Sequence, residues 1–210
     1  ITGGLEYYRE SLFSDKFETG VKENKSQWYA TAFLQDDWSI NKQFSVIAGL
    51  RCDYHEKYGT NLTPKASVMY KIFPFTVRFN YARGYRSPSI KELYMNWDHL
   101  GMFWIYGNSK LKPETNNYIS LSGEYVNSWI NINANVYSNW FRNKIEGMWS
   151  NDQTELHYIN IGKSRLAGVE TMCKIQINRH INVHGAYNYL YTSKDADGVR
   201  LSSSSPHSGN

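Results

Sequence analysis

Cysteine is scarce in this sequence, and long apolar runs are missing from it. The 210 residues contain two cysteines, Cys52 and Cys173, which are too few for a disulfide framework and form no Cys-x-x-Cys pair. No segment approaches the ~20 consecutive apolar residues that a membrane-spanning helix requires. The sequence therefore excludes a helical membrane protein. A mean hydropathy of -0.59 still permits a β-barrel, because barrel strands turn their polar half toward the lumen.

Concentrated positive charge and catalytic motifs are also missing. The formal net charge is +4, and the basic residues are scattered rather than gathered in a run that could follow a phosphate backbone. We therefore expect no nucleic-acid partner. The sequence shows no nucleophile–base pair, metal-ligand triad or phosphate-binding glycine loop, so we expect neither an enzyme nor an intrinsic cofactor.

Aromatic residues, in contrast, are abundant. The chain has 17 Tyr, 7 Trp and 9 Phe, which together make up 16% of its residues. Tyr and Trp suit positions where one end of the ring is apolar and the other is wet. A membrane interface offers such positions, and so does a carbohydrate-binding groove. The composition thus leaves a soluble carbohydrate-binding β-domain open as an alternative to a membrane protein.

Apolar and polar residues alternate along most of the chain, which is typical of β-strands with two different faces. Between Ile130 and Trp140, for example, Asn131, Asn133 and Asn135 alternate with isoleucine, alanine and valine. A helix would scatter these apolar residues around its whole circumference. The pattern predicts about nine strands, with ends uncertain by two to four residues. Their approximate ranges are 3–13, 27–40, 44–56, 62–72, 75–85, 115–126, 129–148, 157–177 and 181–193.

The connections between these predicted strands alternate between long and short. The long ones cover about 14–26, 57–61, 86–114, 149–156 and 194 onward, and the short ones cover 41–43, 73–74, 127–128 and 178–180. In an up-and-down meander, alternate connections lie at opposite ends of the sheet. Outer-membrane barrels have this asymmetry, with short periplasmic turns and longer extracellular loops.

We therefore predict an all-β fold, an antiparallel up-and-down transmembrane β-barrel. Several predicted strands have a dozen residues or more, against a mode of ~5–6 in globular proteins. About nine strands cannot close the even-stranded barrel of a bacterial outer membrane, so we expect the chain to be part of a larger one. The alternative fold is a soluble β-sandwich or a lectin-like jelly roll, which also alternates apolar and polar residues.

Several phrases of the sequence resemble the TonB-dependent outer-membrane receptors. The segment YARGYRSPSIKELY at 81–94 looks like the end of a strand in these receptors, and GNSKLKPET at 107–115 looks like the start of the next one. Four further phrases agree with the family in the same order. They are FLQDDW at 33–38, GLRCDY at 49–54, LTPKAS at 62–67 and YINIGKSRLAGVE at 158–170.

The resemblance implies an import mechanism in the bacterial outer membrane. Receptors of this kind have a large barrel whose pore is filled by an N-terminal plug domain. Extracellular loops and the plug capture a ferric siderophore, haem or a cobalamin-like solute, and the TonB complex then drives import by acting on the plug. We expect residues 1–210 to be part of a single barrel domain, with the plug and the remaining strands absent. The expected partners are outer-membrane lipid, a small-molecule iron carrier and, through the absent plug segment, TonB.

The connection at 86–114 is the predicted site of ligand binding. It is rich in aromatic residues although it belongs to an extracellular loop, and exposed apolar clusters usually indicate binding. The alternative is a loop that packs on itself over the mouth of the barrel. The candidate ligand-binding residues are Tyr85, Arg86, Trp97, His99, Met102, Trp104 and Tyr106.

His99 is the candidate ligand for a haem iron. Haem receptors of this family carry a YRAP-like phrase, an NPNL-like phrase and a histidine between them, and His99 lies between YRSP at 85–88 and NSKL at 108–111. Imidazole suits haem iron. Ser87 replaces the alanine and Ser109-Lys110 replaces Pro-Asn, and siderophore and cobalamin receptors share looser forms of these phrases. The other interpretation of His99 is a loop histidine bonded to a carbonyl or to solvent. An outer-membrane barrel enzyme is the second functional class, without a local motif to support it, and the soluble carbohydrate-binding β-domain is the third.

Overall fold

The structure, a computed structural model, describes residues 1–193 and 206–209. Each of the nine predicted strands is present, and the predicted all-β antiparallel fold is confirmed. The strands are β1 (Thr2–Ser14), β2 (Glu23–Ser39), β3 (Phe44–His55), β4 (Gly59–Ile72), β5 (Phe75–Arg86), β8 (Glu114–Val126), β9 (Ile130–Trp149), β10 (Glu155–Gln176) and β11 (Asn182–Thr192). The start of β2 differs most from its prediction, because Glu23 pairs with the end of β1 at Ser14.

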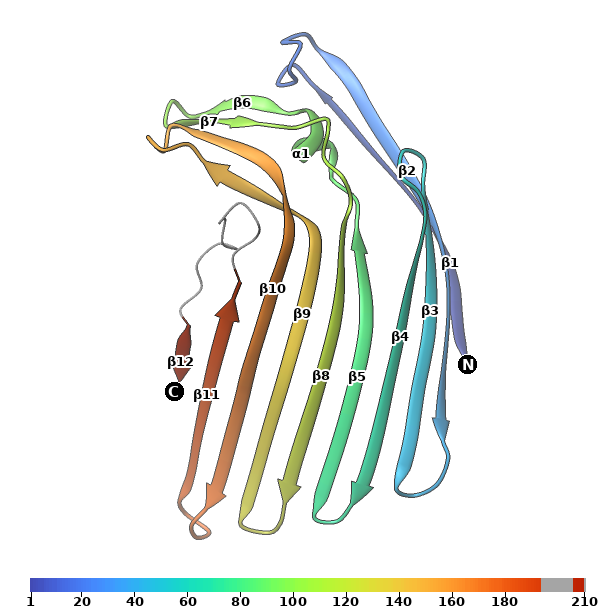
Figure 1. Cartoon of the computed structure of the whole chain (residues 1–210), viewed down its shortest axis with the longest axis vertical. Coiled ribbons are helices and arrows are strands. Elements are labelled where there is room, and N and C mark those ends of the chain that lie inside the picture. Colours follow the sequence, from blue (N-terminus) through green and yellow to red (C-terminus); the bar gives the residue numbers. More distant parts are fainter. Residues whose placement is uncertain (194–205, 210) are drawn as a thin grey trace.

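The strands form one curved, open sheet in the order β1-β2-β3-β4-β5-β8-β9-β10-β11-β12 (Figure 1). Each strand on this path pairs antiparallel with its neighbour. The last strand, β12 (His207–Gly209), pairs with Tyr187–Tyr189 of β11 where the sequence predicted only a polar loop. The rest of the connection predicted from residue 194 onward lies outside the described residues. Among the described residues, no helix is long and apolar enough to cross a membrane.

The two ends of the sheet differ, largely as predicted. The short turns at 40–43, 73–74, 127–129 and 177–181 lie together at the lower end in Figure 1. The opposite end carries the connection between β1 and β2 and the large insertion between β5 and β8. The predicted long connection at 57–61 is wrong, because β4 already begins at Gly59. Gly59 has a φ of 70° and pairs with His55, so residues 56–58 are enough to turn the chain.

The register aligns the apolar residues of successive strands on one face of the sheet. One row of directly paired residues crosses eight strands, and it consists of Trp38, Val46, Val68, Phe79, Leu121, Val136, Val169 and Tyr189. These side chains have no covering layer, so Leu121 and Val136 are each 54% exposed. Such a row fits a surface that contacts lipid rather than water. We call this surface the apolar face and the other surface the polar face.

The polar face carries a network of charged and hydroxyl groups. The guanidinium group of Arg51 contacts Asp53 at 2.9 Å and Glu6 at 3.1 Å. The hydroxyl of Thr31 donates to Asp53 at 2.6 Å. The register brings these residues together, because Asp53 pairs with Thr31 and Thr31 pairs with Glu6. These charges are thus partnered across three strands.

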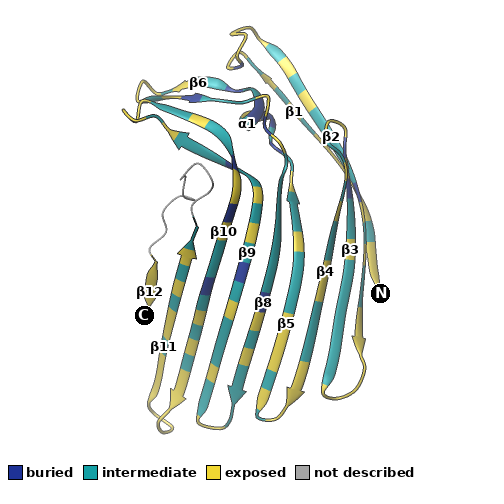
Figure 2. Ribbon diagram, in the orientation of Figure 1, coloured by how far each residue is buried: buried dark blue, intermediate teal, exposed yellow. Residues whose placement is uncertain are grey.

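The buried residues gather at the end of the sheet that carries the long connections. Figure 2 shows many of them around the insertion, while the strand bodies are mostly intermediate and exposed, with a few buried positions on β8, β9 and β10. The insertion was predicted only as one long connection, and the structure shows that it is folded. It contains α1 (Ile90–Tyr94), β6 (Asn96–His99) and β7 (Phe103–Tyr106). β6 pairs with β7, and β7 pairs parallel with the start of β10 at Glu155–His157. These short elements depend on tertiary contacts, which alternation cannot reveal.

Candidate functional site

The short helix α1 connects distant parts of the sheet. On one side, Ile90 and Met95 pack with Phe17 of the connection between β1 and β2. On the other side, Leu93 packs with Leu111 and with Ile145 of β9. A capping box starts the helix, since the Ser89 hydroxyl accepts from the Glu92 amide and the Glu92 carboxylate accepts from the Ser89 amide. The insertion is therefore a folded layer anchored at both ends.

Arg86 links the end of β5 to this helix and to the start of β8. Its guanidinium group lies 2.9 Å from the carboxylate of Glu92 and 3.3 Å from that of Glu114. Glu114 also accepts a hydrogen bond from the backbone amide of Ile145 at 3.1 Å. Both carboxylates are largely buried, with 14% and 15% of their side chains exposed. Arg86, a predicted ligand-binding residue, thus already has two protein partners.

Gly107 and Asn108 close the insertion against the same helix. A Cβ atom on Gly107 would lie 2.8–2.9 Å from backbone atoms of Leu93, Tyr94 and Met95, so only glycine fits there. The backbone amide of Asn108 donates to the Glu92 carbonyl at 2.8 Å. The phrases that carry the family resemblance therefore contact one another and build the scaffold of the insertion.

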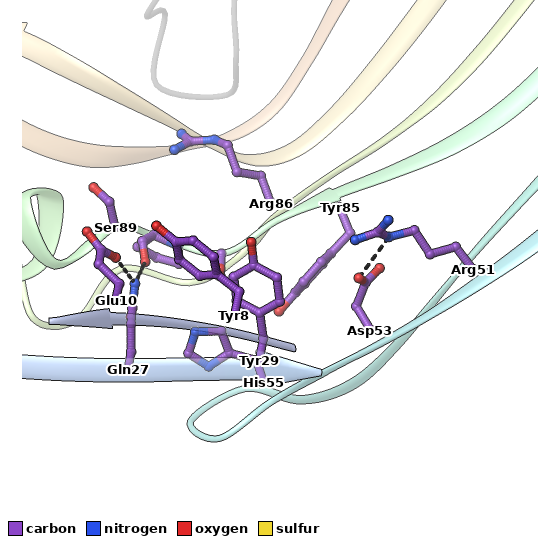
Figure 3. Close-up of a pocket in the computed structure, with 12 residues that line it drawn as sticks. Tyr8, Glu10, Gln27, Tyr29, Arg51, Asp53, His55, Tyr85, Arg86 and Ser89 are labelled. Atoms are coloured by element: carbon purple, nitrogen blue, oxygen red, sulfur yellow. Dashed lines mark hydrogen bonds and ion pairs between the residues drawn. The ribbon is translucent and has the colours of Figure 1, made fainter. Parts of the chain in front are cut away.

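A cavity of about 510 Å³ lies beside the insertion, on the polar face of β1–β3 and at the end of β5 (Figure 3). Two predicted residues, Tyr85 and Arg86, line it. The other lining residues are Tyr8, Glu10, Gln27, Tyr29, Arg51, Asp53, His55, Ser87, Pro88 and Ser89. Tyr8, Tyr29 and His55 come from three different strands and are not among the residues predicted from the sequence. Alternation does assign His55 to the polar face, since it follows Arg51 and Asp53 at a period of two.

The wall of this cavity contains stacked rings and unused hydrogen-bonding groups. Tyr29 stacks on Tyr8 with ring centroids 5.1 Å apart and on His55 at 6.5 Å. His55 Nδ1 accepts from the Lys57 amide at 3.1 Å, which leaves the ring proton on Nε2. His55 Nε2 and the Tyr85 hydroxyl are both buried without a protein partner in the described part of the chain. These two groups can hydrogen-bond to an oxygen-rich ligand or to water.

The other five predicted residues lie on the β6–β7 hairpin. Trp97 packs against the Phe17 cluster, and Tyr106 stacks on His157 at 4.8 Å. Met102 and Trp104 are 63% and 47% exposed near the tip. The hairpin therefore packs on the sheet with some of its aromatic residues and exposes others. The predicted residues thus fall into two groups, one at the cavity and one on the hairpin.

His99 stacks on Phe103 with a centroid distance of 4.8 Å, and Phe103 meets Trp149 of β9 edge-on at 4.8 Å. The imidazole is thus held by ring contacts close to the tip of the hairpin. Among the described residues, no three histidine, cysteine, aspartate or glutamate side chains are grouped so that they could hold a metal ion. Any iron bound at His99 would therefore belong to a complex that brings its own ligands, such as haem.

Comparison with known families supports the resemblance over almost the whole chain. A family model described as TonB dependent receptor-like, beta-barrel matches residues 2–210. The chain is 26% identical over 213 aligned residues to the iron-regulated outer membrane virulence protein of Vibrio cholerae, covering 92% of this chain and 32% of that protein. It is 30% identical to the vitamin B12 transporter BtuB of Vibrio cholerae, covering 81% of this chain and 25% of that protein.

Solved structures agree with the fold. The ferric enterobactin receptor PfeA of Pseudomonas aeruginosa superposes with a TM-score of 0.81 at 20% identity, over 99% of this chain and 35% of that chain. The siderophore receptor PirA of Pseudomonas aeruginosa gives a TM-score of 0.76 at 19% identity, over 90% of this chain and 36% of that chain. The 210 residues thus span about a third of the length of these proteins.

The match decides between the classes that the sequence left open. A soluble carbohydrate-binding domain and an outer-membrane barrel enzyme are both disfavoured, because the matched family consists of receptors and transporters. The chain belongs to the TonB-dependent receptor β-barrel family of the bacterial outer membrane.

Proposed function

We propose that the full-length protein is an active-transport receptor that binds an iron complex, a ferric siderophore in the first place, and imports it with energy from TonB. Residues 1–210 form part of its single barrel domain. The plug domain and the remaining strands lie elsewhere in the full-length protein, and TonB acts on a segment of that plug. A vitamin B12-like solute is the alternative that the similarity to BtuB supports.

The cavity beside the insertion is the observation that carries this proposal. A ferric siderophore is a large, oxygen-rich complex. Tyr8, which is half exposed, offers its ring for stacking, and the Tyr85 hydroxyl and His55 Nε2 offer unused hydrogen-bonding groups. Two relatives of similar fold bear names that refer to siderophores, the siderophore receptor PirA and the ferric enterobactin receptor PfeA.

Replacement of Tyr8 tests the cavity. Tyr8 is 50% exposed and lines the cavity, whereas its neighbour Tyr7 points to the apolar face, so Tyr7→Ala is a matched control. We expect Tyr8→Ala to weaken binding of ferric enterobactin to the detergent-solubilised full-length receptor about 2- to 13-fold, since an aromatic contact contributes ~0.5–1.5 kcal/mol. Quenching of intrinsic fluorescence measures the affinity. Equal affinities of Tyr8→Ala, Tyr7→Ala and the wild type would contradict the assignment of the cavity.

Haem is the second candidate, and the position of His99 favours it. His99 ends β6 beside the tip of the hairpin, where Met102 is 63% exposed and its amide donates to the His99 carbonyl at 3.0 Å. A titration of the full-length receptor with haemin, followed at the Soret band, tests this candidate. A saturable shift that His99→Ala loses and His180→Ala keeps would identify a haem importer. A wild type without a shift would leave the siderophore and the vitamin B12-like solute.

A further inference from the structure

The apolar residues on the lipid-facing side of β9 and β10 end at the same place. On β9, the residues of this face run from Ile130 through Val136 to Trp140, and the next one is Arg142. On β10, Val169 and Ala167 are followed on the same face by Arg165 and Lys163. The register confirms that these positions match, and the pairs are Val136–Val169, Ser138–Ala167, Trp140–Arg165 and Arg142–Lys163.

The length of this apolar stretch equals the thickness of a membrane. The segment from Ile130 to Trp140 covers about ten residue steps, or ~33 Å along the strand. Barrel strands are tilted by ~35–45°, so this stretch spans ~25 Å across the membrane, which is the height of the apolar band of such barrels. Arg142 and Lys163 therefore lie just beyond the hydrocarbon, on the side of the long connections. This is the extracellular side in outer-membrane barrels.

The three cations, Arg142, Lys163 and Arg165, form what we call the basic patch. All three are exposed, and no carboxylate of the described residues lies within ion-pair distance of them. Arg142 and Lys163 are directly paired across the two strands, and like charges in this arrangement destabilise a sheet unless an anion compensates them. The nearby Lys144 has its own partner, Glu146.

One member of the patch is held in a fixed position. Arg165 Nε donates to the Ser138 hydroxyl at 2.8 Å, and the guanidinium group lies 5.2 Å from the centroid of the Trp140 ring. The remaining guanidinium nitrogens have no described partner. Arginine presents a planar donor set that matches phosphate geometry. Tryptophan is typical of the membrane interface, where its ring sits at the level of the headgroups.

We propose that the basic patch binds the phosphate groups of a phosphorylated glycolipid in the outer leaflet of the membrane. Arg142 and Lys163 contact the phosphates, and Arg165 contributes the third positive charge beside them. The acyl chains lie along the apolar row at Val136 and Val169. The position at the edge of the apolar band selects a lipid rather than a soluble anion. The patch lies on the opposite face from the cavity, so this assignment is independent of the imported solute.

The test uses the full-length receptor in neutral detergent and bis-phosphorylated lipid A as the probe, with affinity measured by native mass spectrometry. Each basic residue near an anionic lipid surface contributes about fivefold in affinity, so we expect Arg142→Gln/Lys163→Gln to bind about 25-fold more weakly. Lys42→Gln/Arg179→Gln is the matched control, because it removes the same charge from exposed positions in the short turns at the other end. The control should bind like the wild type.

Two further outcomes overturn the proposal. If both double variants lose affinity equally, general charge attraction explains the binding and the patch is not a site. If the wild type binds dephosphorylated lipid A as tightly as the phosphorylated form, the phosphates are not recognised. Equal midpoints of thermal unfolding for the two double variants show that a loss of affinity does not come from misfolding.

Discussion

Arg86 is predicted to bind the ligand, but its guanidinium group already forms ion pairs within the protein. Its guanidinium group contacts Glu92 and Glu114, which belong to the two phrases on which the family resemblance depends. Gly107, in the second phrase, is required because the helix backbone passes close to it. The two phrases that most strongly resemble the family therefore contain residues that stabilise the fold of the insertion. Ligand contacts have to be sought in the residues around that scaffold.

Replacement of Arg86 should consequently affect stability first. Arg86→Ala leaves the carboxylates of Glu92 and Glu114 largely buried without their cation. Because Arg86 itself is 45% exposed, we expect a moderate loss of about 1–3 kcal/mol in the free energy of unfolding. Denaturant unfolding of the solubilised full-length receptor measures this loss, with Arg179→Ala in a distant turn as the control. An Arg86→Ala variant as stable as the control, but impaired in ligand binding, would instead indicate a ligand contact.

At the scale of elements, the strands could be predicted and the insertion could not. The strands of this sheet separate two environments along their whole length, so each one repeats its alternation for a dozen residues or more. α1, β6 and β7 are too short to show a period of their own. α1 is held by Phe17 and Ile145, and β7 by the start of β10. These contacts come from segments that are far away in the sequence, so local sequence patterns cannot predict them.

The ring of Phe103 is one of the contacts that hold the β6–β7 hairpin, because it stacks on His99 and meets Trp149 edge-on. Phe103→Ala removes both contacts while the pairing of β7 with β10 remains. We expect amide hydrogen exchange to accelerate about tenfold or more within residues 96–106 and to stay unchanged in the body of β9, because local opening costs less than global unfolding. Trp129→Ala, at an exposed position in a short turn, is the control. Unchanged exchange in the hairpin would show that backbone pairing alone holds it.

At the scale of the whole molecule, the pairing register of the strands decides which residues lie side by side. Alternation along one strand assigns a residue only to a face of the sheet. The sequence assigned Tyr8, Tyr29 and His55 to no site, because they are separated by more than twenty positions from strand to strand. The pairing Tyr8–Tyr29–His55 then places them side by side on the polar face. The same register lines up the apolar row on the other face. A cavity and a lipid-facing surface thus follow from one pairing scheme, yet neither could be located before the pairing was known.

The open sheet leads to a last prediction, which concerns the 210-residue chain expressed by itself. β1 presents an unpaired edge, and side chains such as Leu34, Leu121 and Val136 are 54–60% exposed on the apolar face. Unpaired edges and large apolar surfaces promote association in water. We expect the isolated chain to aggregate in detergent-free buffer, as measured by light scattering, whereas the full-length receptor stays monodisperse in detergent. A monodisperse, detergent-free monomer with cooperative unfolding would show that the polar face and the insertion suffice to stabilise a sheet whose other face has no partner.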